Sequence, residues 1–121
     1  MNVSNFQIAQ NRPSGTSAVT AISATQNLIE ITAIYVANTT GSAVDYYIFH
    51  DDDGTTYSQD TALYYNVSVP ANSTVKIASE TLNGGIGLKP GSGGRIGIQT
   101  DTADALNFTF YGHTAAVATG R

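Results

Sequence analysis

The densest group of residues that could do chemistry is the run Asp51-Asp52-Asp53, which precedes Gly54. Calcium prefers several carboxylate and carbonyl oxygens from one loop, so this run could hold a cation. The EF-hand pattern, however, needs acids at alternate positions before the glycine and a glutamate later. Phe49 occupies the place of the first acid, and no glutamate follows in that pattern. The run is therefore interpreted as a solvated turn, with a bound cation as the alternative, and we expect no metal or cofactor.

The histidines are His50 and His113, and either could be drawn into a Ser/His/Asp triad. The Gly-x-Ser-x-Gly turn that exposes a nucleophilic serine in α/β-hydrolases is missing, so only proximity in the fold could support a triad. The glycines between residues 84 and 97 match neither nucleotide-binding glycine motif, and we interpret them as turn glycines. We expect no enzyme. A small β-sandwich hydrolase that depends on His50 is kept as the least favoured alternative.

Aromatic side chains form the second candidate group. Tyr46-Tyr47 and Tyr64-Tyr65 are adjacent pairs within strand-like segments. Successive side chains of a strand point to opposite faces, so one tyrosine of each pair must face away from the core. Outward rings could pack on another protein or stack on sugar, whereas the alternative is that the rings simply fill the core. We therefore take all four tyrosines as candidate partner-binding residues.

The overall composition narrows the class of function. Charged residues make up 12% of the 121 positions, about half the usual share, and the net charge is −4. Five scattered Lys and Arg residues give no footprint for nucleic acid. The chain has no apolar run long enough to cross a membrane, no signal peptide and no cysteine. This composition fits synthesis in a reducing cytoplasm and a weakly charged surface that can lie against protein.

The elements that position these residues are all predicted to be strands. Residues 28–51 are predicted to form a central β-hairpin, with Asn38 and Gly41 in its turn because both tolerate positive φ. Alternation predicts one face with Ile29, Ile31, Ala33 and Tyr35, and the opposite face with Glu30, Thr32, Ile34 and Val36. In the later strand it predicts a shared face for Leu63, Tyr65, Val67 and Val69.

Further strands are predicted at 16–25, 62–69, 74–80, 86–88, 95–100 and 105–112. About eight short antiparallel strands and no helix of useful length predict an all-β fold, a single β-sandwich or jelly-roll-like domain over residues 16–121.

Residues 1–15 are polar, lack periodicity and contain Arg12-Pro13, which favours an extended segment. We expect an N-terminal arm that becomes ordered on a neighbouring subunit, with Phe6 and Ile8 as apolar anchors and Arg12 and Pro13 as further partner-binding residues. The alternative is a frayed terminus.

The segment from Ile31 to Gly112 resembles small bacteriophage virion proteins. The resemblance is carried by Ile-Thr-Ala-Ile-Tyr-Val-Ala-Asn-Thr-Thr, Asp-Gly-Thr-Thr-Tyr, Val-Pro-Ala-Asn-Ser-Thr-Val, Leu-Lys-Pro-Gly and Phe-Thr-Phe-Tyr-Gly. It is similar to head decoration (cement) proteins, and also to small tail or fibre components. The resemblance implies a β-sandwich module, often trimeric, that sits on a virion.

The leading hypothesis is therefore a capsid decoration protein that binds and stabilises the shell of major capsid protein. We expect a homo-oligomer, with a trimer favoured, made in the host bacterial cytoplasm and located on the capsid surface, without nucleic-acid or membrane partners. The alternative is a tail or fibre component that binds host glycan through the outward tyrosines.

Overall fold

The computed structural model describes residues 5–78, 85–90 and 93–116, which form two antiparallel sheets packed as a sandwich. The elements in chain order are β1 (Phe6–Asn11), β2 (Val19–Ser23), β3 (Asn27–Asn38), β4 (Val44–Asp51), the short 3-10 turn η1 (Gln59–Thr61), β5 (Ala62–Val69), β6 (Thr74–Ile77), β7 (Ile86–Leu88), β8 (Arg95–Thr100) and β9 (Leu106–Ala116). The predicted all-β sandwich is confirmed, with nine strands in place of about eight.

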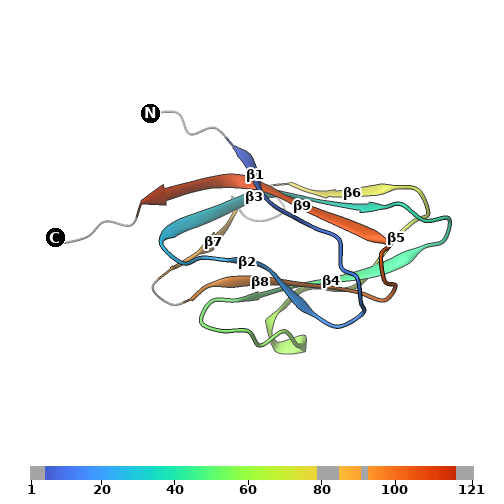
Figure 1. Ribbon diagram of the computed structural model, residues 1–121, viewed down its shortest axis with the longest axis horizontal. Helices are drawn as coiled ribbons and strands as arrows, with labels where there is room; N and C mark the ends of the chain where they lie inside the picture. Colours follow the sequence, from blue (N-terminus) through green and yellow to red (C-terminus); the bar gives the residue numbers. More distant parts are fainter. Residues whose placement is uncertain (1–4, 79–84, 91–92, 117–121) are drawn as a thin grey trace.

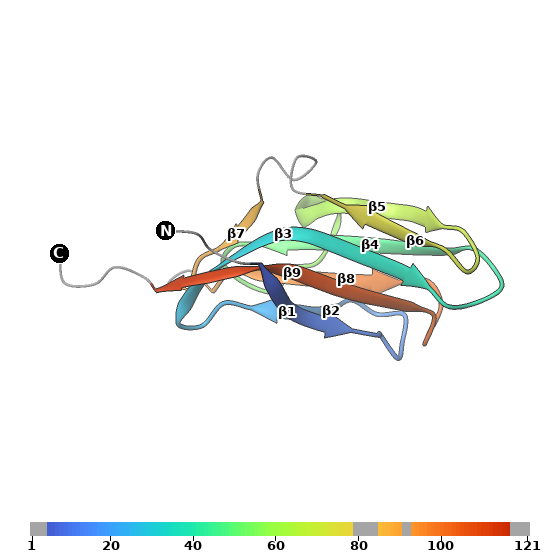
Figure 2. The ribbon, with the colours of Figure 1, turned by 90° about the horizontal axis from the view of Figure 1, so that it is seen from above.

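One sheet has five strands in the order β1-β9-β3-β6, and β7 extends it by pairing with the first part of β3. The other sheet has four strands in the order β2-β8-β4-β5. Figure 1 shows the two layers one above the other, and Figure 2 shows β6, β3, β9 and β1 side by side.

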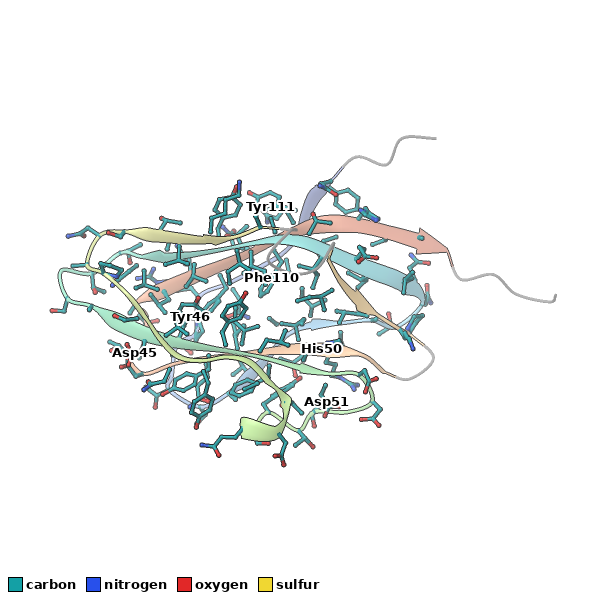
Figure 3. The ribbon with its side chains drawn as sticks, turned by 180° about the vertical axis from the view of Figure 1, so that it is seen from behind. Asp45, Tyr46, His50, Asp51, Phe110 and Tyr111 are labelled. Carbon is teal, nitrogen blue, oxygen red and sulfur yellow. The ribbon has the colours of Figure 1, made fainter. Side chains whose placement is uncertain are left out.

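The core lies between the sheets and is built from the inward-facing positions of both. In the five-stranded sheet Ile34 lies opposite Phe110 and Val36 opposite Phe108, and all four side chains are buried. In the other sheet the buried inward residues are Tyr46, Ile48, Ile96 and Ile98. Figure 3 shows Phe110 and Tyr46 between the layers, whereas Tyr111 lies on the outer side.

The expected hairpin at 28–51 is wrong in its pairing. Both strands exist, but β3 pairs with β6, β7 and β9, whereas β4 pairs with β5 and β8, so the chain crosses from one sheet to the other. The buried side chain of Asn38 holds this crossing. Its Nδ2 donates to the carbonyl oxygens of Ser42 (2.8 Å) and Val69 (3.0 Å), and its Oδ1 accepts from the backbone N–H of Thr40 (2.9 Å). Asn38 thus acts through its amide group, and neither it nor Gly41 has a positive φ.

An irregularity in β3 overturns the predicted division of its faces. The register shifts between Ile31 and Ala33, because Thr32 is an extra residue opposite β9. Ile31 faces the core before this bulge, and Ile34 faces it afterwards. A bulge reverses the alternation of side chains, so Ala33 and Tyr35 lie on the outer face and not with Ile31.

A comparable shift in β5 overturns the shared face expected for its apolar residues. Val67 lies opposite Tyr46, and Tyr64 lies opposite Ile48, so β5 has one more residue than β4 between these pairs. Asn66, within the extra length, has a φ of 59°. Val69 is buried, but Leu63 and Tyr65 are 45% and 48% exposed.

The N-terminal segment also differs from the expected arm. Residues Phe6–Asn11 are extended, but they form β1, which pairs with β9 of the same chain from Phe6↔Gly112 to Asn11↔Phe108. Backbone hydrogen bonds to its own sheet make Phe6–Asn11 part of the sandwich, and contact of this segment with a neighbouring subunit stays a prediction.

Three predicted features lie partly outside the described residues, namely the start of the arm at 1–4, the end of the predicted strand at 79–80, and turn glycines at 84 and 91. Within the described part of the chain, no helix has the length and apolar character needed to cross a membrane.

Candidate functional site

The tyrosine pairs divide between the two faces of the four-stranded sheet, as the alternation predicted. Tyr46 is 1% exposed and lies in the core, and Tyr64 packs against that core. Tyr47 and Tyr65 lie on the outer face, where their rings meet edge to face with centroids 4.9 Å apart. Tyr65 is the more exposed of the two. The outward members of each pair thus lie side by side, as an interface or ligand patch requires.

The two outward tyrosines belong to a larger group, the outer aromatic cluster, which consists of Tyr47, Phe49, Tyr57 and Tyr65. Phe49 is nearly parallel to Tyr47 (6.4 Å, 5°) and is stacked with Tyr57 on its other side (6.0 Å, 26°). Phe49 is only 1% exposed although it lies outside the core between the sheets. The cluster is therefore a small second apolar layer, and its rings fix one another in place.

Tyr57 closes one side of the cluster because the strand beneath it carries a glycine. Gly97 of β8 lies opposite Phe49 of β4, and a Cβ atom at Gly97 would lie 2.6 Å from the Tyr57 ring. The Tyr57 hydroxyl is 2.6 Å from the hydroxyl of Thr20 in β2. These contacts hold the segment between β4 and η1 over the sheet, so only Tyr47 and Tyr65 remain as the open side of the cluster.

Two acids border the open side. The backbone N–H of Asp45 donates to Asp101 Oδ1 (3.2 Å), and the Tyr47 hydroxyl donates to Asn66 Oδ1 (2.9 Å). Desolvation raises the pKa of Tyr47, and Tyr65, Asp101 and Asp45 raise it further. Tyr47 is thus a neutral phenol at physiological pH. A partner that covers this surface would meet aromatic rings beside a small negative border.

The four candidate residues of the N-terminal segment are used mainly within the chain. Ile8 packs against the core, and Pro13 is buried with its carbonyl oxygen accepting from the N–H of Asp104 (2.9 Å). Arg12 donates to Thr39 Oγ1 (2.9 Å) and to the carbonyl oxygen of Asp104. Phe6 differs from these three, because half of its surface remains exposed.

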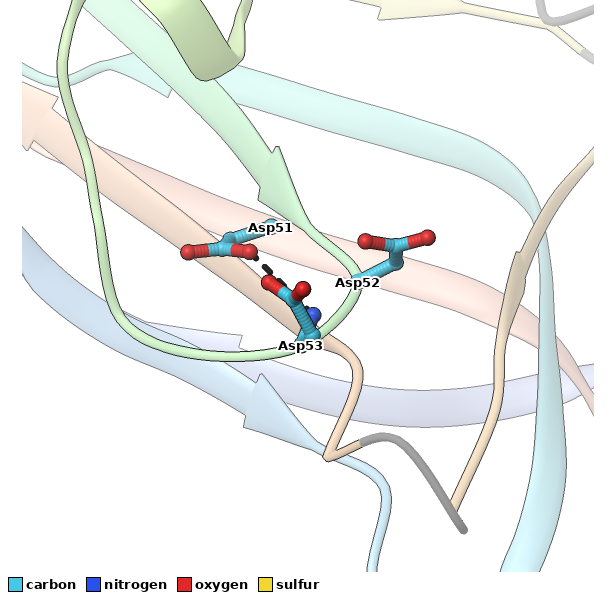
Figure 4. A group of neighbouring side chains, drawn as sticks. All are labelled: Asp51, Asp52 and Asp53. Atoms are coloured by element: carbon cyan, nitrogen blue, oxygen red, sulfur yellow. Dashed lines mark hydrogen bonds between the residues drawn. The ribbon is translucent and has the colours of Figure 1, made fainter.

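The carboxylate oxygens of Asp51, Asp52 and Asp53 lie within 4.8 Å of one another (Figure 4). Asp51 is buried, and its carboxylate accepts the N–H groups of Thr56 (2.7 Å) and Asp53 (3.1 Å). These bonds lower the pKa of Asp51, whereas a side-chain hydrogen bond with Asp51 and the nearby negative charges raise the pKa of Asp53. Asp51 therefore caps the turn that leads to Tyr57, which agrees with the predicted turn.

The two histidines have different surroundings. His50 lies opposite Ile96 on the inner side of β4, and its Nε2 has no hydrogen-bond partner among the described residues. The Nδ1 atom of His113 lies 3.2 Å from Asn5 Oδ1. Within the part of the chain that the structure describes, neither imidazole forms a hydrogen bond with a serine or an acid. The geometry thus gives no support to the triad considered as an alternative.

One further surface was not predicted from the sequence. Tyr35, Tyr111 and Lys76 come from three strands and meet on the outer face of the five-stranded sheet. No local motif joins them, because only the register of β3, β6 and β9 brings them together.

A comparison with models of known protein families finds no match for this chain. A comparison with curated proteins likewise finds no similar protein.

Proposed function

We propose that the protein is a bacteriophage capsid decoration protein, which binds the outer surface of the major capsid protein shell as an oligomer and stabilises it. The observation that carries the proposal is the open side of the outer aromatic cluster. Tyr47 and Tyr65 form an aromatic surface on a molecule with few charges, and Leu63 of the same strand as Tyr65 is exposed as well. Aromatic surface of this kind is enriched in protein interfaces.

The mechanism follows from the shape and charge of this surface. The Tyr47 ring already packs against Phe49 and Tyr65, so docking orders few side chains and loses little conformational entropy. Each copy adds a modest contact, and an oligomer joins several contacts because the second becomes intramolecular once the first has formed. A shell covered in this way would resist the internal pressure of packaged DNA.

The role first expected for the N-terminal arm needs a different test. Deletion of residues 1–15 would remove β1 and leave β9 paired on one side only, so a loss of binding would not identify a partner contact. Among the described residues of this segment Phe6 is the one exposed large hydrophobic residue, and Phe6→Ala leaves the strand in place.

The test adds purified protein to expanded empty capsids that were assembled without it, and measures occupancy by sedimentation and by electron microscopy. We expect Leu63→Ser/Tyr65→Ser to lower the affinity at least tenfold, because truncation of aromatic interface residues typically costs above about 1–2 kcal/mol. Thr109→Val, on the outer face of the other sheet, is the matched control and should bind as the parent does.

Failure of the parent protein to bind such capsids would contradict the proposal. Full occupancy by the double variant would remove the role of the aromatic surface.

A further inference from the structure

The outer face of the five-stranded sheet contains a hollow of about 380 Å³, within the size range of small-molecule sites. It lies on the opposite side of the sandwich from the outer aromatic cluster. Tyr35 and Tyr111 form its aromatic wall, with ring centroids 5.6 Å apart and an interplanar angle of 81°. Thr32, Thr109, Lys76 and Asn5 supply polar groups around them.

Strand register builds the hollow. Thr109 of β9, Tyr35 of β3 and Lys76 of β6 lie directly opposite one another across three neighbouring strands. The bulge at Thr32 then places the small residue Ala33 opposite Tyr111. The large side chain of Tyr111 therefore lies beside the methyl group of Ala33, which leaves space next to the aromatic rings.

Four polar groups of the hollow are free to bind a ligand, whereas Thr32 donates to the Tyr111 carbonyl oxygen and Asn5 contacts His113. In the part of the chain that the structure describes, no protein group forms a hydrogen bond with the hydroxyls of Tyr35, Tyr111 or Thr109. The Lys76 ammonium has no acid partner there, and it lies 5.8 Å from the centroid of the Tyr35 ring. The hollow thus offers the hydroxyls of both tyrosines and of Thr109, together with the Lys76 ammonium, beside two partly buried rings.

We propose that this hollow binds a sugar ring, with any anionic group of the sugar against Lys76. A pyranose has apolar C–H faces that pack on aromatic rings, and hydroxyls at its edge that pair with hydroxyl and ammonium groups. The hollow offers aromatic rings and hydrogen-bonding groups close enough together to contact a single sugar ring. The site is separate from the surface assigned to capsid docking, so it would remain open on a docked molecule.

A peptide fits the same surface less well. Peptides that bind sheets commonly add a strand to a free edge and gain main-chain hydrogen bonds. The rings of the hollow stand on β3 and β9, and each of these strands is already paired on both sides. A ligand here must be held by side chains alone, which suits a small polyhydroxylated ring.

The test screens the intact protein on an array of neutral, N-acetylated and uronic-acid saccharides, and measures methyl glucoside and methyl glucuronide in solution by NMR titration. We expect binding on the array and dissociation constants on the order of 1 mM for a single ring. The Tyr35→Phe/Tyr111→Phe variant keeps both rings and removes both hydroxyls, so it should fold normally and weaken binding at least fivefold. Val19→Ala, at an exposed position of β2 in the other sheet, should bind as the parent does.

Lys76→Gln separates the two sugar classes. It should weaken methyl glucuronide at least threefold, because the charge-assisted contact with the carboxylate is lost. It should change methyl glucoside by less than about 1.5-fold, because the Gln amide can still donate to a neutral hydroxyl. Equal effects on both would overturn the contact between Lys76 and an anionic group.

Absence of saccharide binding by the parent would overturn the proposal, as would binding that the double variant leaves unchanged. Binding of short peptides without any saccharide would overturn it in favour of a peptide site. Capsid binding is measured separately with variants of the opposite face, so either proposal can fail without the other.

Discussion

The imidazole of His50 has a buried nitrogen whose hydrogen bonding is not satisfied by the described residues. It lies on the inner side of β4 with Nε2 buried and without a hydrogen-bond partner among the described residues. Desolvation lowers the pKa of His50, and the carboxylates of Asp52 and Asp51 oppose this shift only in part. The folded state therefore favours the neutral imidazole more than the unfolded chain does.

This predicts a loss of stability on mild acidification. A base whose pKa is lowered by folding contributes its full stability above the unfolded value of about 6.5, and loses it as the pH falls through that value. We expect the free energy of unfolding, measured by urea denaturation, to fall between about pH 7.5 and 5.5 with a slope below the one-proton limit of about 1.4 kcal/mol per pH unit.

Substitution His50→Gln should flatten this dependence, whereas His113→Gln should leave it in place. The Asp51 carboxylate does not interfere, because its pKa is lowered from 3.8 and its contribution is lost only at more acidic pH. An unchanged slope in His50→Gln would contradict the assignment.

At the scale of strands and turns, the sequence predicted which segments are extended better than it predicted what they pair with. Alternation located nearly every strand, because a half-buried strand imposes a period of two on its own residues. It did not show that β3 and β4 belong to different sheets, since a five-residue connection suits both a hairpin and a crossing between layers. The crossing depends on Asn38, which bonds to residues 31 and 32 positions away.

The same limit applies to the candidate sites. Alternation predicted that one tyrosine of each pair faces outward, because adjacent residues must face opposite ways, but it did not predict which one. The hollow could not be predicted. Alternation assigned Tyr35 to the face of Ile31, but the bulge at Thr32 places Tyr35 on the opposite face. Composition does not reveal a bulge, although each bulge changes the face to which the later side chains of its strand point.

The bulge in β3 also depends on Gly112 in the neighbouring strand. A Cβ atom at Gly112 would lie 1.8 Å from the carbonyl oxygen of Glu30, so Gly112→Ala forces the two backbones apart. We expect a destabilisation at or above the upper end of the usual range of about 1–3 kcal/mol for overpacking. Equilibrium denaturation of the purified variant measures this change.

Gly87 gives a matched control in the same sheet, because a Cβ atom there meets nothing within 4 Å. Gly87→Ala should change the free energy of unfolding by less than about 1 kcal/mol. Equal stability of the two variants would mean that the close approach at Gly112 is relieved at no cost.

At the scale of the whole molecule, the outer faces of the two sheets differ in their side chains. One carries the outer aromatic cluster with Asp45 and Asp101 beside it, and the other carries the hollow with Lys76. The proposed functions use one face each, so the sandwich would act as a spacer between a shell and the surroundings.

The low charge of the chain predicts how docking responds to salt. Charged residues are only 12% of the sequence, and the aromatic rings contribute no net charge to the contact. Salt screens interactions between exposed charges and leaves apolar burial largely intact. We expect capsid occupancy to change less than about twofold between about 50 mM and 500 mM sodium chloride, measured by co-sedimentation. A steep fall in occupancy with salt would show that ion pairs dominate the contact.

The pairing of the first strand with the last has a mechanical consequence. Phe6 at the start of β1 lies opposite Gly112 near the end of β9, so both strands leave the sandwich at the same end (Figure 1). Tension between the two ends of the chain would peel these strands apart one hydrogen bond at a time, and would not shear the whole ladder at once. Under the proposed function, load should therefore reach the protein through its broad faces and not through the start of β1 and the end of β9.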